Sequence, residues 1–146
     1  MNYSYWLAGA VVAMTLAGAS SSVGQTEGPK KTQWEGVYTE EQAKRGAEAY
    51  QASCASCHGP DLRGGEMSPA LAGPEFASTW DGLSLGDLFD RIRTSMPLNN
   101  PGGLTSRQYS DVLAFMLSQG GAPAGQTELG SRADALQPVR FVATKP

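Results

Sequence analysis

The chain has 146 residues, among them 18 glycines and 9 prolines, and 8% of its residues are aromatic. This composition allows one small domain with a thin apolar core, and such a domain often needs a covalent link or a cofactor for stability. A formal net charge of −3 gives no basic footprint for nucleic acid.

The first 24 residues predict an export signal. From Tyr5 to Ala19 the chain is almost entirely apolar or small, and Ala17-Gly18-Ala19 has the small-x-small pattern of a cleavage site. The run is shorter than the roughly 20 residues of a membrane span. No Lys or Arg precedes it, so an uncleaved amphiphilic tail or a misplaced start stays open as the alternative. Residues 25–33 are expected to form a flexible leader, followed by a domain over residues 34–120.

Three helices are predicted from their capping signals. Each begins with Thr or Ser followed three residues later by Gln or Asp, at Thr39 and Gln42, at Ser84 and Asp87, and at Thr105 and Gln108. The first helix runs into Cys54. The second stops near Thr94, because Pro97 disfavours helical backbone at Met96. The third ends at Gly120-Gly121.

Apolar side chains recur at helical spacing within these segments. The repeats are Ala43, Gly46, Ala47 and Tyr50, then Leu85, Leu88, Phe89 and Ile92, then Tyr109, Val112, Leu113, Met116 and Leu117. The segment 59–73 is predicted to be a loop, and a short helical piece after it carries Phe76 and Trp80. Residues 121–146 are rich in Pro, Gly and polar residues, so an extended C-terminal tail is expected.

The segment Cys54-Ala-Ser-Cys57-His58 holds the only two cysteines and the only histidine of the chain. Covalent haem attachment requires two thiols spaced for the two vinyl groups of a porphyrin, and an imidazole beside the second thiol to ligate the iron. The motif therefore predicts one c-type haem held by Cys54, Cys57 and His58.

Competing roles for this motif fit the residues less well. A thioredoxin-like C-x-x-C occurs near a βαβ pattern, whereas the flanks here are helical. A structural zinc site usually has four Cys or His ligands, and only three are present. A plain disulfide stays open in an exported protein, but it leaves His58 without a role.

A second axial ligand then has to be a methionine. Outside the predicted signal, the candidates are Met67 in a Gly-rich loop, Met96 between a helix and a proline, and Met116 on an apolar helix face. Met116 has the position of a core residue. Met96 is favoured, because 38 residues (96 − 58) separate it from His58 and allow the chain to reach the opposite haem face.

The whole pattern resembles the class I cytochromes c, over about residues 34–120. The resemblance implies an all-α fold wrapped around one covalently attached haem, with the N- and C-terminal helices crossing. It implies close approach of the helices at Gly46, with Gly46 and Tyr50 packed against Tyr109 and Leu113. It also implies a single-electron carrier rather than an enzyme.

Three further residues take roles from the same resemblance. The Pro69 carbonyl would accept the Nδ1–H of His58, Trp80 would donate to a haem propionate, and Asn99 would place its amide against the methionine sulfur. Each residue also has a purely structural alternative role. Pro69 could be a loop proline, Trp80 a core aromatic residue packed against Leu85, and Asn99 a turn residue.

The segment from Pro123 to Leu129 resembles the tail of periplasmic monohaem cytochromes associated with quinoprotein dehydrogenases. The expected partners are therefore a dehydrogenase donor and an oxidase or another cytochrome as acceptor, in the periplasm, with no nucleic acid and no stable membrane anchor. A haem peroxidase or gas sensor with a vacated sixth site is the alternative function.

Overall fold

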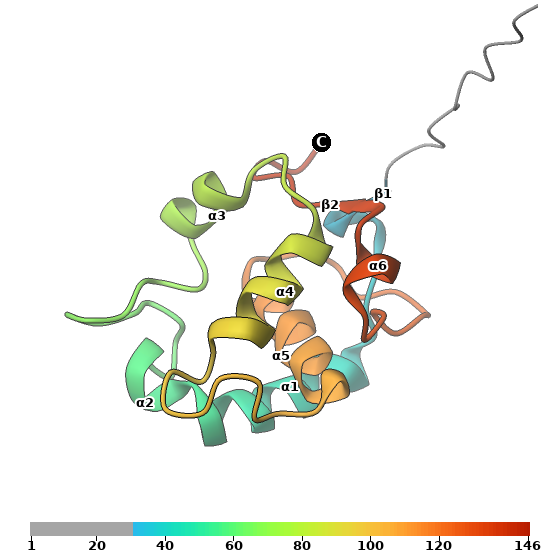
Figure 1. Cartoon of the computed structure of the whole chain (residues 1–146). Coiled ribbons are helices and arrows are strands. Elements are labelled where there is room, and N and C mark those ends of the chain that lie inside the picture. The colour runs from blue at the N-terminus through green and yellow to red at the C-terminus, as the bar shows by residue number, and fades with distance from the viewer. Residues whose placement is uncertain (1–30) are drawn as a thin grey trace, which may run out of the picture.

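The computed structural model describes residues 31–146, and it is mostly helical (Figure 1). In chain order the elements are β1 (Lys31–Thr32), the 3-10 helix η1 (Gln33–Glu35), α1 (Glu40–Ser53), α2 (Ala55–His58), α3 (Pro74–Trp80), α4 (Leu85–Ser95), α5 (Ser106–Gln119), α6 (Ala133–Leu136) and β2 (Val139–Arg140). None of the helices in this described part is long and apolar enough to cross a membrane. The predicted signal, residues 1–24, lies outside the described residues.

The three long helices begin at the predicted capping residues. The side chains of Thr39, Ser84 and Thr105 each accept a hydrogen bond from the backbone N–H three residues later. At α4 and α5 the side chain at that third position returns a bond to the cap, which completes the capping box. At α1 it does not, because the Gln42 side chain lies in the interior, 1% exposed.

Helices α1 and α5 cross and pack closely, as predicted (Figure 1). The contact depends on Gly46, where an added Cβ would lie 1.8 Å from the carbonyl oxygen of Asp111 and 2.9 Å from the Cβ of Phe115. The ring of Phe115 also packs against Tyr50, with the ring centroids 5.3 Å apart. The close approach expected at Gly46 is therefore present, and its nearest neighbours are Asp111 and Phe115 rather than Tyr109 and Leu113.

The fold is not purely helical. Strands β1 and β2 form a parallel pair in which Lys31 lies opposite Val139 and Thr32 opposite Arg140. The described end of the expected leader is therefore ordered. Gln33 is buried, and its side-chain amide donates to Val142 O at 2.6 Å and accepts from Val142 N at 2.9 Å.

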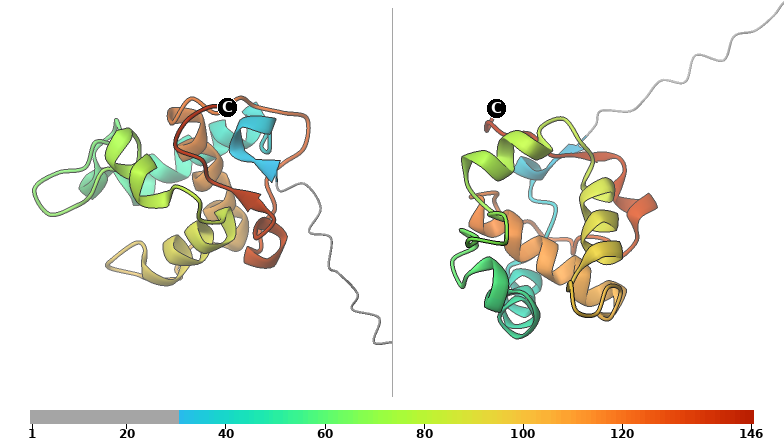
Figure 2. Two further views of the ribbon diagram at one scale, coloured as in Figure 1. Left: turned by 90° about the horizontal axis from the view of Figure 1, so that it is seen from above. Right: turned by 60° about the vertical axis from the view of Figure 1, so that its left-hand side comes forward.

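The prediction of an extended C-terminal tail is wrong. Residues 121–146 fold back over the domain, and α6 packs against α4 (Figure 2). Five apolar side chains of this segment are buried: Ala122, Leu129, Leu136, Val139 and Phe141. Their burial stabilises the segment, because apolar surface is removed from water on both sides of the contact.

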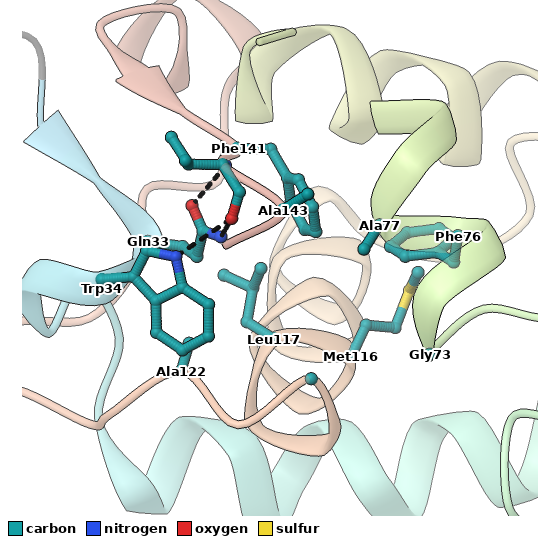
Figure 3. Close-up of a pocket in the computed structure, with 12 residues that line it drawn as sticks. Gln33, Trp34, Gly73, Phe76, Ala77, Met116, Leu117, Ala122, Phe141 and Ala143 are labelled. Atoms are coloured by element: carbon teal, nitrogen blue, oxygen red, sulfur yellow. Dashed lines mark hydrogen bonds between the residues drawn. The ribbon is translucent and has the colours of Figure 1, made fainter. Parts of the chain in front are cut away.

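The segment packs against α3 and α5. A cavity of about 40 Å³ remains between them, beside Trp34 and Phe141. Figure 3 shows the Gln33 amide hydrogen-bonded to the backbone next to Phe141, and Met116 extending toward Phe76. The rings of Phe76 and Phe141 meet edge to face at 5.8 Å.

Candidate functional site

One helical turn carries the two thiols and the imidazole. Cys54 lies between α1 and α2, and its carbonyl accepts hydrogen bonds from Cys57 N at 3.1 Å and His58 N at 3.0 Å. His58 is the last residue of α2. Both cysteines are free thiols, with Cys54 half-buried and Cys57 exposed. The turn therefore places three groups of the predicted attachment motif within one short segment.

The His58 ring is buried and oriented by one backbone contact. The side chain is 6% exposed, and its Nδ1 lies 2.9 Å from the carbonyl oxygen of Pro69. Because a carbonyl can only accept, Nδ1 carries the proton and Nε2 is left with a free lone pair in the neutral ring. This is the contact that the class I cytochrome resemblance implies for Pro69.

The loop between α2 and α3 brings Pro69 back to His58. The His58 carbonyl accepts from Gly64 N at 2.8 Å, and Leu71 N donates to Leu62 O at 2.8 Å. At Gly64, φ is +77° and an added Cβ would lie 2.4 Å from Ser68 O. Only glycine fits this crossing without displacing the backbone.

Tyr50 anchors the end of the motif from α1. Its hydroxyl donates to Gly59 O at 2.6 Å, and its side chain is fully buried. Burial first, and then the neighbouring Cys54 and Asp61, raise the pKa of Tyr50 to about 12, so the hydroxyl remains a donor at neutral pH. The sequence predicted Tyr50 as a core residue, but this hydrogen bond has no sequence signal.

Burial also acts on Cys54. Loss of hydration, and then the neighbouring Cys57, raise the pKa of the Cys54 thiol above its usual range. The group is therefore a neutral thiol at physiological pH, unlike the thiolate that redox-active cysteines present.

Met96 lies at the far end of α4. It is the C-cap of that helix, half-buried, and its N–H donates to Ile92 O at 2.9 Å. Its carbonyl accepts from the hydroxyl of Tyr109 at 2.7 Å. In the right-hand view of Figure 2, the C-terminal end of α4 and helix α2 lie on opposite sides of α1.

The other two methionines in the described part have different surroundings. Met67 is 95% exposed, in the loop between α2 and α3. Met116 is buried among the core side chains of α5, near Phe76 (Figure 3).

In the part of the chain that it describes, the structure shows no hydrogen bond that bears on the roles predicted for Trp80 and Asn99. Trp80 is half-buried at the end of α3, with its ring 6.3 Å from that of Phe76. Asn99 is exposed in the loop between α4 and α5. Within residues 31–146 neither side chain hydrogen-bonds to another residue, so their predicted roles remain predictions.

These groups fit a covalently attached haem. In the described part, no fully buried side-chain nitrogen or oxygen lacks a hydrogen-bond partner. His58 Nε2 has no hydrogen-bond partner in this part of the protein, so the atom itself must be in contact with solvent-accessible space, although the ring as a whole is buried. A lone-pair imidazole nitrogen and two free thiols on one turn are the donors that a c-type haem requires. Among residues 31–146, no group of three or more His, Cys, Asp and Glu residues is arranged to hold a metal ion directly.

The comparison with protein families agrees with this donor set. The family model described as cytochrome c oxidase, cbb3-type, subunit III matches residues 41–116, just over half of the chain. The chain belongs to this cytochrome c family. It is therefore a class I c-type cytochrome, a haem-based electron carrier rather than an enzyme, and it has redox partners.

The match extends from α1 into α5 and includes Cys54, Cys57, His58 and Met96. Residues 121–146, which form α6 and β2, lie beyond it. No curated protein and no solved structure matches the chain at a significant level.

Proposed function

We propose that this cytochrome is an exported carrier of single electrons with one haem, which is bound through Cys54 and Cys57 and ligated by His58 and Met96. The observation that carries the proposal is the His58 ring, whose Nδ1 is tied to Pro69 O at 2.9 Å while Nε2 has its lone pair free. When bound, the haem supplies an iron that changes between Fe(II) and Fe(III) by one electron.

Burial favours Met96 as the second ligand. Met67 is almost fully exposed, so it would have to bring its whole loop inward. Met116 is already packed in the core, where methionine commonly fills space. Met96 is half-buried and follows a helix whose last turn holds its backbone.

The remaining residues orient and shield the iron ligands. The Pro69 carbonyl fixes the tautomer and direction of the His58 ring. With the haem bound, Trp80 would donate to a propionate and the Asn99 amide would lie against the Met96 sulfur, as the class I cytochrome resemblance implies. If Met96 ligates the iron as proposed, no position would be open for a substrate, and a peroxidase or gas sensor would not fit.

The proposed location is the periplasm, because residues 1–24 have the pattern of an export signal. The donor would be a dehydrogenase of the quinoprotein class, either as a separate protein or in one complex with the chain, and the acceptor an oxidase or another cytochrome. Leu98 is 80% exposed beside Met96 and would lie at the centre of the contact surface. Small, weakly charged contacts suit the brief encounters of electron carriers.

The proposal is tested by the spectrum of the oxidised holoprotein and by replacing Met96. We expect a weak absorption band at the red end of the spectrum that reports sulfur bound to Fe(III). Met96→Ala should abolish this band, lower the reduction potential and admit cyanide, while the covalent haem remains, because Cys54, Cys57 and His58 are unchanged.

Met67→Ala and Met116→Leu are the matched controls, and both should keep the band. Loss of the band in Met67→Ala but not in Met96→Ala would show that the ligand assignment is wrong. Absence of the band in the unaltered protein would favour a vacated sixth site and the alternative functions.

A further inference from the structure

The loop that follows Met96 is held by few contacts of its own. Its internal hydrogen bonds are Asn100 N to Pro97 O at 2.8 Å, Gly103 N to Asn100 O at 3.0 Å and a longer one from Gly102 N to Met96 O at 3.4 Å. Residues 98–103 are exposed. Turns of this kind do not by themselves fix where the loop lies relative to the rest of the domain.

One buried hydroxyl ties both ends of this loop to α5. Tyr109 is 1% exposed, and its hydroxyl donates to Met96 O at 2.7 Å and accepts from Leu104 N at 3.3 Å. Met96 is the first residue of the loop and Leu104 lies near its end. The same oxygen therefore closes the loop at both ends.

The position of the hydroxyl is determined by the packing of α5 in the core and against α1. Tyr109 lies in the first turn of α5, whose Leu113 and Val112 are buried in the core, and α5 crosses α1 at Gly46. A buried aromatic ring has little freedom to move. The bond to the Met96 carbonyl thus fixes the backbone directly attached to the Cα that bears the thioether.

We propose that Tyr109 is a positioning residue for the Met96 ligand. Its hydroxyl holds the Met96 backbone so that the thioether stays in place and leaves the iron rarely. This inference rests on the proposed His58 and Met96 ligation. It assigns Tyr109 no contact with the haem.

The test compares Tyr109→Phe with Tyr38→Phe in the oxidised holoprotein. Tyr38 is the matched control, because it is 3% exposed and its hydroxyl donates to a single backbone carbonyl, Ala122 O, at 2.5 Å, in a different part of the chain. Both variants lose one buried hydroxyl. Only Tyr109→Phe loosens the Met96 backbone.

The two measurements are the rate of cyanide binding, which requires the methionine to leave, and the temperature at which the sulfur band disappears. Loss of the hydrogen bond to the Met96 carbonyl should make cyanide binding about fivefold faster in Tyr109→Phe. In Tyr109→Phe the sulfur band should also disappear at a lower temperature than the one at which the whole domain unfolds. In Tyr38→Phe the cyanide rate should change less than about twofold, since its lost bond does not reach Met96.

Equal cyanide rates in the two variants would overturn the inference and leave the ligation intact. A missing sulfur band in the unaltered protein would instead refute the ligation, and the inference with it.

Gly102→Ala is the second test variant, to be measured in the same way if Tyr109→Phe yields no holoprotein. Gly102 N makes the other bond to Met96 O, at 3.4 Å, and φ there is +75°, so alanine strains the same anchor. Faster cyanide binding in that variant supports the inference, and an unchanged rate contradicts it.

Discussion

Two glutamines at the same position of the same short motif act differently in the structure. Gln108 accepts a hydrogen bond from the backbone N–H of Thr105 at 3.0 Å and completes the capping box of α5. Gln42 instead turns inward, where its amide accepts from Leu129 N at 2.6 Å and donates to Leu129 O at 3.1 Å. The difference arises because the C-terminal segment covers the start of α1.

Replacing each glutamine by methionine separates the two roles. Gln42→Met should lower the free energy of unfolding by about 2–3 kcal/mol, because the buried N–H of Leu129 would lose its partner, while the Leu129 carbonyl keeps the Ser110 hydroxyl. Gln108→Met should cost only about 1 kcal/mol, since it removes part of an exposed helix cap. Urea unfolding of both holoproteins measures the difference, and equal losses would contradict the assigned role of Gln42.

The same pair shows what a local motif can predict. Thr39 and Thr105 both cap a helix as their spacing indicates, because the capping bond involves only neighbouring residues. The partner of Gln42 lies 87 residues further along the chain. No local pattern signals a contact at that separation, so the spacing of Thr39 and Gln42 predicts the helix start but not the inward turn of the Gln42 side chain.

At the scale of secondary-structure elements, the sequence predicts the three long helices closely but misses α6. Helix α4 ends at Ser95, one residue beyond the expected end near Thr94, and α5 covers Ser106–Gln119 between its predicted cap and Gly120. Proline and the capping residues act on adjacent backbone, which is why these limits were predictable. The hydroxyl contacts of Tyr50 and Tyr109 were not, because both tyrosines also satisfy the ordinary pattern of a buried helix face.

The crossing of α1 and α5 makes Gly46 intolerant of any side chain. In Gly46→Ala the new Cβ would overlap the Asp111 backbone, so the helices must separate, and overpacking of this kind costs about 1–3 kcal/mol. Gly120→Ala is the control, because Gly120 has φ −76° and an added Cβ there meets nothing closer than 3.4 Å. Thermal unfolding should show a lower midpoint for Gly46→Ala alone. A Gly46→Ala protein as stable as Gly120→Ala would contradict the close crossing.

At the scale of the whole molecule, the two ends of the described chain complete the domain together. Gln33 binds both backbone groups of Val142, and the Arg45 guanidinium joins Asp111 of α5 to Glu128 of the C-terminal segment. In the sequence, Val139, Phe141 and Val142 form a short apolar patch within a polar segment, and no local pattern indicates what it packs against. Its partners lie near residues 33, 76 and 84, and pairing across such separations depends on the assembled core.

Shortening the chain tests whether the C-terminal segment is part of the domain. A chain that ends at Gly130 keeps the Gln42 contacts with Leu129 but loses α6, β2 and the buried Leu136, Val139 and Phe141. Burying each such side chain contributes about 1.5–3 kcal/mol, partly offset by the ordering of the segment, so we expect a loss of at least about 2 kcal/mol.

The control for this truncation is a chain that ends at Ala143. It lacks only the exposed Thr144, Lys145 and Pro146 and retains Val142, so it should unfold like the full-length holoprotein. The shorter chain also removes the Val142 partner of Gln33 and the contact of the Ser84 hydroxyl with Gln137 Oε1, 2.9 Å long, at the start of α4. Because α4 carries Met96 at its other end, the shorter chain should also bind cyanide faster. A chain ending at Gly130 that matches the control in both unfolding and cyanide binding would show that the segment only rests on a domain that is complete without it.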